Sequence, residues 1–263
     1  NYSRLKWIRI EGADMFRRFR GAEKQFGLPF GSRLIQYKEK EEIMGLYDVK
    51  TQLDEALSPS VFLPSGGQLH ITETPACITV DVDTGLSDRI KGRKFVRDTN
   101  LEAAQMLARQ IRLRNLGGKI IVDFVRNKNR KDGQILIDTL KVELSSDENS
   151  TSVLGFTKLG LLELLRSRRS MSLNDLMLEH ETFGALRKRN FMTIAYEVLR
   201  QIDKTARFYP GRPITVRAHC RVKDILNNDL RGDLNKAIEK IGIPILLTDD
   251  DNISQDTIEV YPT

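Results

Sequence analysis

Cysteine is scarce in this sequence. The chain contains only two, Cys77 and Cys220, which lie far apart and each inside an apolar stretch. Two such residues cannot supply the closely spaced pairs of a zinc knuckle, and a disulfide framework needs more of them. We therefore expect both to be small buried core residues of a protein from a reducing compartment, and we expect no bound zinc.

Long apolar runs are missing as well. No stretch reaches the ~18 uninterrupted apolar residues that a membrane-spanning helix needs. The opening NYSRLKWIRIEG carries charges where a secretory leader has its apolar core, so we expect a cytoplasmic protein. Basic residues outnumber acidic ones by 42 to 36, an excess that permits a nucleic-acid partner without requiring one.

The first half of the chain alternates strand and helix patterns. Two short strand patterns, LKWIRIE and SRLIQY, are each followed by a helix pattern, and residues 61–85 read as a hairpin broken at a Ser-Gly-Gly turn. Residues 86–98 show no periodicity and predict a mobile loop. The helix that follows should begin at a cap on Thr99 or Asn100 and stop at the Gly-Gly pair before the apolar strand KIIVDFV.

The second half continues this alternation. A helix is predicted over 133–144, while GFTKLGLLELLRSRRS fits either a helix or a strand. From about residue 190, a helix, a strand, a second helix and two further strands suggest a small α/β module. The order of elements predicts an α/β fold in which helices flank a sheet.

Acidic residues lie near the ends of two of these strands. Asp81 and Asp83 belong to ITVDVDTG, and Asp123 lies inside KIIVDFV. A right-handed crossover through the intervening helix would make the two strands parallel, so that Asp81 faces Asp123 across one sheet edge. Asp83 has the same facing as Asp81. Two interpretations stay open: a turn, which Asp, Thr and Gly commonly form, or a cation site built from carboxylates.

Four motifs follow one another along the chain: LPSGG, ITVDVDTG, TNLEAAQMLARQIRLRNLGGKIIVDF and LGLLELLRSR. In this order they resemble the catalytic region of the RNase E/RNase G family of bacterial endoribonucleases. The resemblance implies an RNase H-like mixed sheet with flanking helices over residues 1–175. A linker over 176–189 and a small α/β domain over 190–263 would follow.

The resemblance also implies a site. In the family two aspartates hold one magnesium ion, and the matching residues here are Asp81 and Asp123, with Mn²⁺ as a substitute metal. Asp83 is a third candidate catalytic residue at a position where the family often has Asn, so this chain carries an additional negative charge there.

Two features of the family have no counterpart in the sequence. The RNA-binding OB-type domain and the sensor of 5′-monophosphates would precede the region matched here, and the cysteines of the zinc link are missing from LMLEHETFGALRKRN. His180 lies in that stretch without neighbouring donors, and we expect a surface histidine. Self-association is therefore expected to use the C-terminal module, whose helix FMTIAYEVLRQI is apolar on more than one face.

Basic residues cluster beside the acids. We expect RNA contacts from two loops, comprising Arg89, Lys91, Arg93, Lys94, Arg97, Lys128 and Arg130. The runs RSRR at 166–169 and RKR at 187–189 are weaker candidates, because charge runs are usually solvated faces. Arg114, on the helix between the two strands, should face solvent or carboxylates, and Phe124 should belong to the core.

The sequence therefore predicts a magnesium-dependent endoribonuclease that hydrolyses single-stranded RNA to 5′-phosphate and 3′-hydroxyl ends. The alternative is a non-catalytic RNA-binding or assembly protein with the same fold. Both predict affinity for RNA, so only cleavage in the presence and absence of magnesium separates them.

Overall fold

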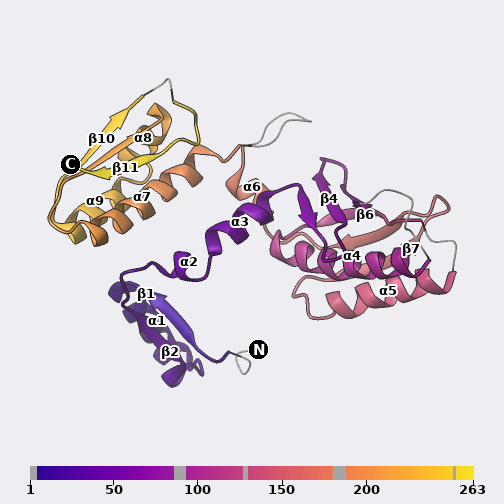
Figure 1. Ribbon diagram of the computed structural model, residues 1–263. Helices are drawn as coiled ribbons and strands as arrows, with labels where there is room; N and C mark the ends of the chain where they lie inside the picture. The colour runs from indigo at the N-terminus through magenta and orange to yellow at the C-terminus, as the bar shows by residue number, and fades with distance from the viewer. Residues whose placement is uncertain (1–4, 86–92, 127–129, 180–187, 251–252) are drawn as a thin grey trace. The chain divides into compact units, whose positions relative to one another are not determined.

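A computed structural model describes residues 5–85, 93–126, 130–179, 188–250 and 253–263 of the chain (Figure 1). Its internal contacts form two compact units. One unit is continuous and comprises residues 51–190, while the other combines residues 1–50 with residues 191–263. The predicted positions Arg89, Lys91, Lys128 and His180 lie outside the described residues.

The continuous unit is built on a six-stranded mixed sheet with the order β3-β4-β5-β6-β8-β7. The strands are β3 (Ser60–Phe62), β4 (Gln68–Glu73), β5 (Ile78–Asp83), β6 (Gly118–Asp123), β7 (Thr151–Phe156) and β8 (Leu162–Arg166). Only the pairing of β5 with β6 is parallel, and the other four pairings are antiparallel. The segment that the sequence left open between helix and strand forms the end of β7 and all of β8.

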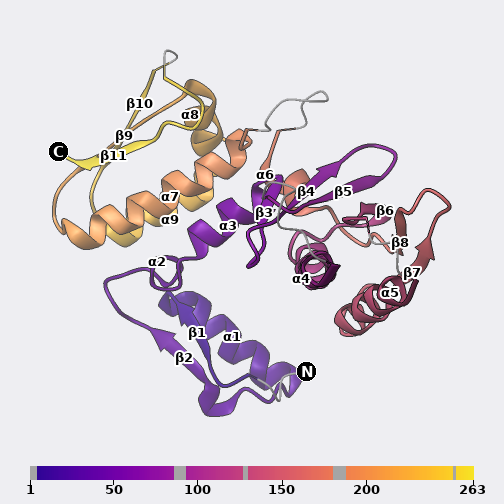
Figure 2. The ribbon, with the colours of Figure 1, turned by 45° about the vertical axis from the view of Figure 1, so that its right-hand side comes forward.

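Two long helices cover one face of this sheet. They are α4 (Arg93–Leu113) and α5 (Arg130–Leu144), which lie side by side in both views (Figures 1 and 2). The alternation of β5 places Ile78, Val80 and Val82 in the core beneath the helices, while Asp81 and Asp83 stay exposed. Two shorter helices, α3 (Val49–Leu57) and α6 (Leu173–Met177), complete this part of the chain.

The second unit contains a small α/β region, as expected. Its C-terminal part consists of α7 (Phe191–Phe208), β9 (Ile214–Ala218), α8 (Cys220–Asn227), α9 (Arg231–Ile241), β10 (Ile245–Asp249) and β11 (Glu259–Pro262). The central strand β9 pairs in parallel with β10 and antiparallel with β11. Helix α8 was not predicted, because its eight residues are too few for a clear period.

The N-terminal part of the same unit is a strand–helix–strand. Strands β1 (Ile8–Glu11) and β2 (Leu34–Tyr37) pair in parallel, with α1 (Ala13–Phe26) between them. A short 3-10 turn, η2 (Gly31–Arg33), precedes β2, and α2 (Ile43–Leu46) follows it. Glu11 and Arg207 form an ion pair between β1 and α7.

Several local predictions were wrong. Helix α4 begins at Arg93, so part of the predicted loop is helical and neither Thr99 nor Asn100 caps the helix. Both cysteines are free, but they are half-buried rather than buried. Phe124 belongs to the core as expected, with 7% of its surface exposed.

Two arginines expected at the surface are buried. Arg114 is 1% exposed and donates from its Nε to Gln110 at 2.7 Å. Arg166, from the RSRR run, is 3% exposed and forms a two-pronged contact with the Asp147 carboxylate at 2.7 and 3.1 Å. It also donates to the Leu116 carbonyl oxygen. Arg166 is thus a structural residue of the sheet and is not available to RNA.

Candidate active site

The parallel pairing of β5 with β6 brings two carboxylates together. In the register of the two strands Asp81 lies directly opposite Asp123, which confirms the arrangement expected from a crossover through α4. Neighbouring strands lie about 4.8 Å apart, and paired residues project from the same face. Both aspartates are exposed, and among the described residues neither carboxylate has a hydrogen-bond or ion-pair partner. Their four oxygens are therefore free to bind a ligand.

Asp83 has a different role in the backbone. Its Oδ1 accepts the N–H of Gly85 at 3.1 Å, the local bond of an Asx turn, so the turn interpretation holds for this residue. The LPSGG turn packs directly against it: a Cβ on Gly67 would lie 2.6 Å from the Asp83 carbonyl oxygen, and one on Gly85 would lie 2.3 Å from that of Gly66. Side chains at either glycine would push the end of β5 out of place.

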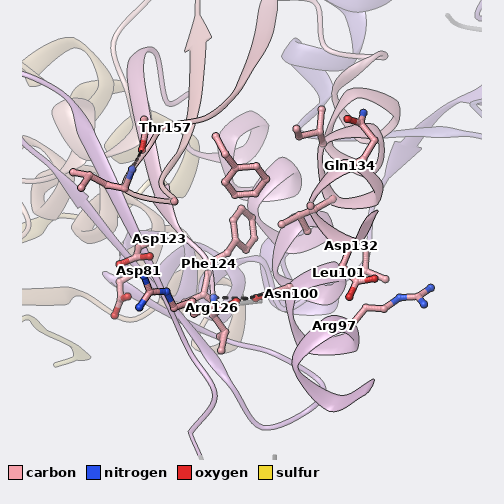
Figure 3. A pocket seen from close by; sticks show the side chains of 18 of the residues that line it. Asp81, Arg97, Asn100, Leu101, Asp123, Phe124, Arg126, Asp132, Gln134 and Thr157 are labelled. Carbon is pink, nitrogen blue, oxygen red and sulfur yellow. Dashed lines mark hydrogen bonds between the residues drawn. The ribbon is translucent and has the colours of Figure 1, made fainter. Parts of the chain in front are cut away.

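A cavity of about 970 Å³ opens at the ends of β5 and β6. Asp81 and Asp123 line one side of it, and α4, α5 and the turn between β7 and β8 line the others. In Figure 3 the Phe124 ring lies between Asp123 on one side and Leu101 and Asp132 on the other. Asp83 is not among the lining residues. The structure therefore brings together two of the three predicted acids at one cavity.

Asn100 fastens helix α4 to the strand that carries Asp123. Its amide group donates to the Val125 carbonyl oxygen at 2.8 Å and accepts the Val125 N–H at 3.1 Å (Figure 3). The side chain is only 5% exposed, and it satisfies both backbone groups of a residue that no longer pairs with a neighbouring strand. The bonds hold the chain that leads from Asp123 to Arg126 against the helix.

Basic side chains reach the cavity from two places. Arg97 on α4 lines it, as does Arg126, which follows β6 and belongs to the RNKNRK run. Lys94 is exposed on the first turn of α4. Arg93 and Arg130 begin helices α4 and α5, and only their backbone is described. Of the seven predicted RNA-binding residues, Arg97 is the one that the structure places at the cavity.

The donor set suits a hard divalent cation better than zinc. The described residues contain no group of three or more His, Cys, Asp or Glu side chains that could hold a metal. Two unpaired carboxylates at the rim of a cavity nevertheless fit magnesium, which usually takes one or two carboxylates and keeps several waters. Asp81 and Asp123 are the residues that would hold such an ion.

Comparison with known proteins matches most of the chain to a family. The model of the Ribonuclease E/G family fits residues 2–169, a range that contains both aspartates, Asn100 and the cavity. The chain belongs to this family.

Curated members of the Ribonuclease E/G family align with much of the chain. Ribonuclease G of Salmonella typhimurium is 34% identical over 218 residues, which are 81% of this chain and 43% of that protein. Ribonuclease G of Escherichia coli K12 is 35% identical over 204 residues, which are 75% of this chain and 41% of that protein. Ribonuclease E of Synechocystis is 37% identical over 150 residues, which are 57% of this chain and 22% of that protein. The chain thus spans less than half the length of these relatives.

The sequence did not reveal every residue around the cavity. Asn100 was predicted to be a helix cap. Its place in the TNLEAA motif was the available signal of a role at the site. The turn Phe156–Gly160 and two residues of α5, Gly133 and Gln134, were not predicted to lie at the site. The glycine and the aromatic residue in GFTKLG were the available signal, but the ambiguity between helix and strand hid the turn.

Proposed function

We propose that this chain is the catalytic part of an endoribonuclease that hydrolyses single-stranded RNA with one magnesium ion. The observation that carries the proposal is the pairing of Asp81 with Asp123 at the rim of the cavity, in a chain of the Ribonuclease E/G family. The relatives are named as ribonucleases, which supports an RNA substrate. Manganese is the expected substitute metal, and the cytoplasm is the proposed location.

In the proposed reaction a water attacks phosphorus and the bond from phosphorus to the 3′-oxygen breaks. This leaves a 5′-phosphate and a 3′-hydroxyl end. Asp81 and Asp123 would hold the magnesium ion, which would supply positive charge to the phosphate and make the attacking water more acidic. Arg97 and Arg126 offset the negative charge of neighbouring phosphates. Asn100 keeps Asp123 and Arg126 at fixed positions on the rim.

The alternative is a non-catalytic RNA-binding or assembly protein. No helix in the described parts of the chain is both long and apolar enough to cross a membrane. Incubation of an end-labelled single-stranded RNA with and without magnesium decides between them. Cleavage only with magnesium supports the enzyme, and stable binding without cleavage supports the alternative. Mapping the ends of the products tests the direction of bond cleavage.

Arginines at the cavity should set the salt dependence of RNA binding. Replacing Arg97 or Arg126 by Ala is expected to lower the affinity and to reduce the slope of log affinity against log salt by about 0.7 each. Arg109→Ala is the matched control, because Arg109 is exposed on the same helix and does not line the cavity. Titrations by fluorescence anisotropy at several salt concentrations measure both quantities. An unchanged slope would place the RNA backbone elsewhere.

Asp83 should weaken RNA binding through its charge. Asp83→Asn keeps an oxygen that accepts the Gly85 N–H while removing the negative charge. We expect the affinity for RNA to rise by about threefold at low salt and by less at high salt, because screening reduces the repulsion. The same anisotropy titrations measure it. Lower affinity in the variant would mean that the carboxylate itself contributes to binding.

A further inference from the structure

The cavity is much larger than a metal site requires. A cation with six water molecules of about 30 Å³ each fills roughly a fifth of its 970 Å³. The volume lies at the upper end of the ~300–1,000 Å³ that is common for pockets of small organic ligands. The space beyond Asp81 and Asp123 is therefore large enough for a further ligand group.

An aromatic side chain forms one wall of this space. Phe156, the last residue of β7, lines the cavity while 39% of its surface remains exposed. Its ring packs against the first turn of α5, where a Cβ on Gly133 would lie 3.4 Å from the ring atom Cε2. The missing side chain at Gly133 thus allows the ring to lie close to the helix. The exposed part of the ring is available for stacking.

Polar groups stand at the rim of the same space. Gln134 donates from Nε2 to Asp138 at 3.0 Å, which leaves its amide oxygen and one N–H for a ligand. Lys158, in the turn after Phe156, lines the cavity and adds a positive charge. Arg97 and Arg126 add two more. An aromatic wall, an amide that can donate and accept, and three cations match a nucleotide with its phosphates.

We propose that this part of the cavity is a subsite for one unpaired nucleobase of the bound RNA, stacked on Phe156 with its edge toward Gln134. The inference rests on the proposed function, because it assumes an RNA strand whose phosphate lies near Asp81 and Asp123. The subsite would select single-stranded over double-stranded RNA, since a paired base cannot leave its helix without a cost in stacking energy.

The test is a double-mutant cycle between the ring and the base. A fluorescein-labelled single-stranded RNA is prepared intact and as a set in which one abasic ribose replaces each nucleotide in turn. Every protein carries Asp123→Asn to keep the RNA intact, and Phe156→Leu removes the aromatic face while it keeps an apolar side chain. Phe62→Leu is the matched control, because Phe62 is 73% exposed in the same unit and does not line the cavity.

We expect Phe156→Leu to weaken binding of the intact RNA by about tenfold, and Phe156→Tyr to restore it. One abasic position should cause a similar loss with the Phe156 protein and little further loss with Phe156→Leu, which is the signature of a direct contact. Additive losses at every position, or a Phe156→Leu protein that binds like the Phe62→Leu control, would overturn the subsite.

The proposed function is judged separately by cleavage with the unsubstituted chain. Coupling between Phe156 and a base without any cleavage would reject the enzyme and leave the subsite in place. Magnesium-dependent cleavage without such coupling would reject the subsite alone.

Discussion

Asp81→Asn is expected to lower the rate of magnesium-dependent RNA cleavage by about a thousandfold, and Asp123→Asn by a similar factor. Each change removes a negative charge from a metal ligand and leaves the side-chain volume nearly unchanged. A loss of about 4 kcal/mol of transition-state stabilisation corresponds to this factor. Single-turnover cleavage of an end-labelled single-stranded RNA provides the measurement.

Asp98→Asn is the control for this pair. Asp98 is exposed on α4 next to Arg97 but does not line the cavity, so the same chemical change there should leave the rate within about twofold. In the absence of metal, the stability of the Asp81 and Asp123 variants should equal or exceed that of the unsubstituted chain, because two neighbouring carboxylates repel each other. If either variant cleaved RNA at the rate of the unsubstituted chain, the substituted aspartate would have no part in the mechanism.

Asp147→Asn is expected to destabilise the continuous unit by about 3–5 kcal/mol, the cost of leaving a buried charge without its partner. The side chains of Asp147 and Arg166 are 4% and 3% exposed, so water cannot replace the lost contact. Denaturant-dependent hydrogen exchange of β7 and β8 measures the stability of this unit alone. Asp54→Asn, which breaks a partly exposed pair with Arg189 in the same unit, should cost less than about 1 kcal/mol.

The contribution of Asp147 should depend on pH. Burial raises the pKa of its carboxyl, but hydrogen bonds from Arg166 and from the Asn149 N–H outweigh burial and hold the pKa below its usual value. The pKa is thus lower in the folded than in the unfolded chain. Its stabilisation is complete above the usual carboxyl pKa of about 3.9 and is lost as the pH falls through the lower folded value. The difference between the Asp147→Asn variant and the unsubstituted chain should shrink in that range, and a constant difference would argue against the ion pair as its cause.

The sequence predicted the pairing of the two aspartates because the connection between their strands decides it. A strand, a helix and a second strand in succession are nearly always joined by a right-handed crossover, which makes the two strands parallel. This connection places Asp81 opposite Asp123. The prediction needed no knowledge of side-chain packing. Only the match of the strand ends mattered, and both strands end at or just beyond their aspartate.

Packing explains what the sequence did not show. Asn100 has a strong local preference for a helix cap, but its bonds to Val125 provide partners that only the folded sheet supplies. Arg114 and Arg166 look like solvated charges in a basic run, and their burial depends on distant partners such as Gln110 and Asp147. Local patterns cannot distinguish an arginine that is paired in the core from one in water.

The continuous unit has a consequence for how the chain folds. The bridge between Leu178 and Arg189, together with the ion pair from Arg189 to Asp54, brings the two ends of this unit close to one another. Before residues 51–190 fold, they form a loop of about 140 residues between the two segments of the other unit. Once they have folded, the two segments are joined by a connection with the effective length of a short turn. Loop-closure entropy makes this difference worth about 3 kcal/mol. Folding of the unit that carries the aspartates thus stabilises the other unit. A substitution that unfolds the first unit would therefore also destabilise the unit made from the two ends of the chain.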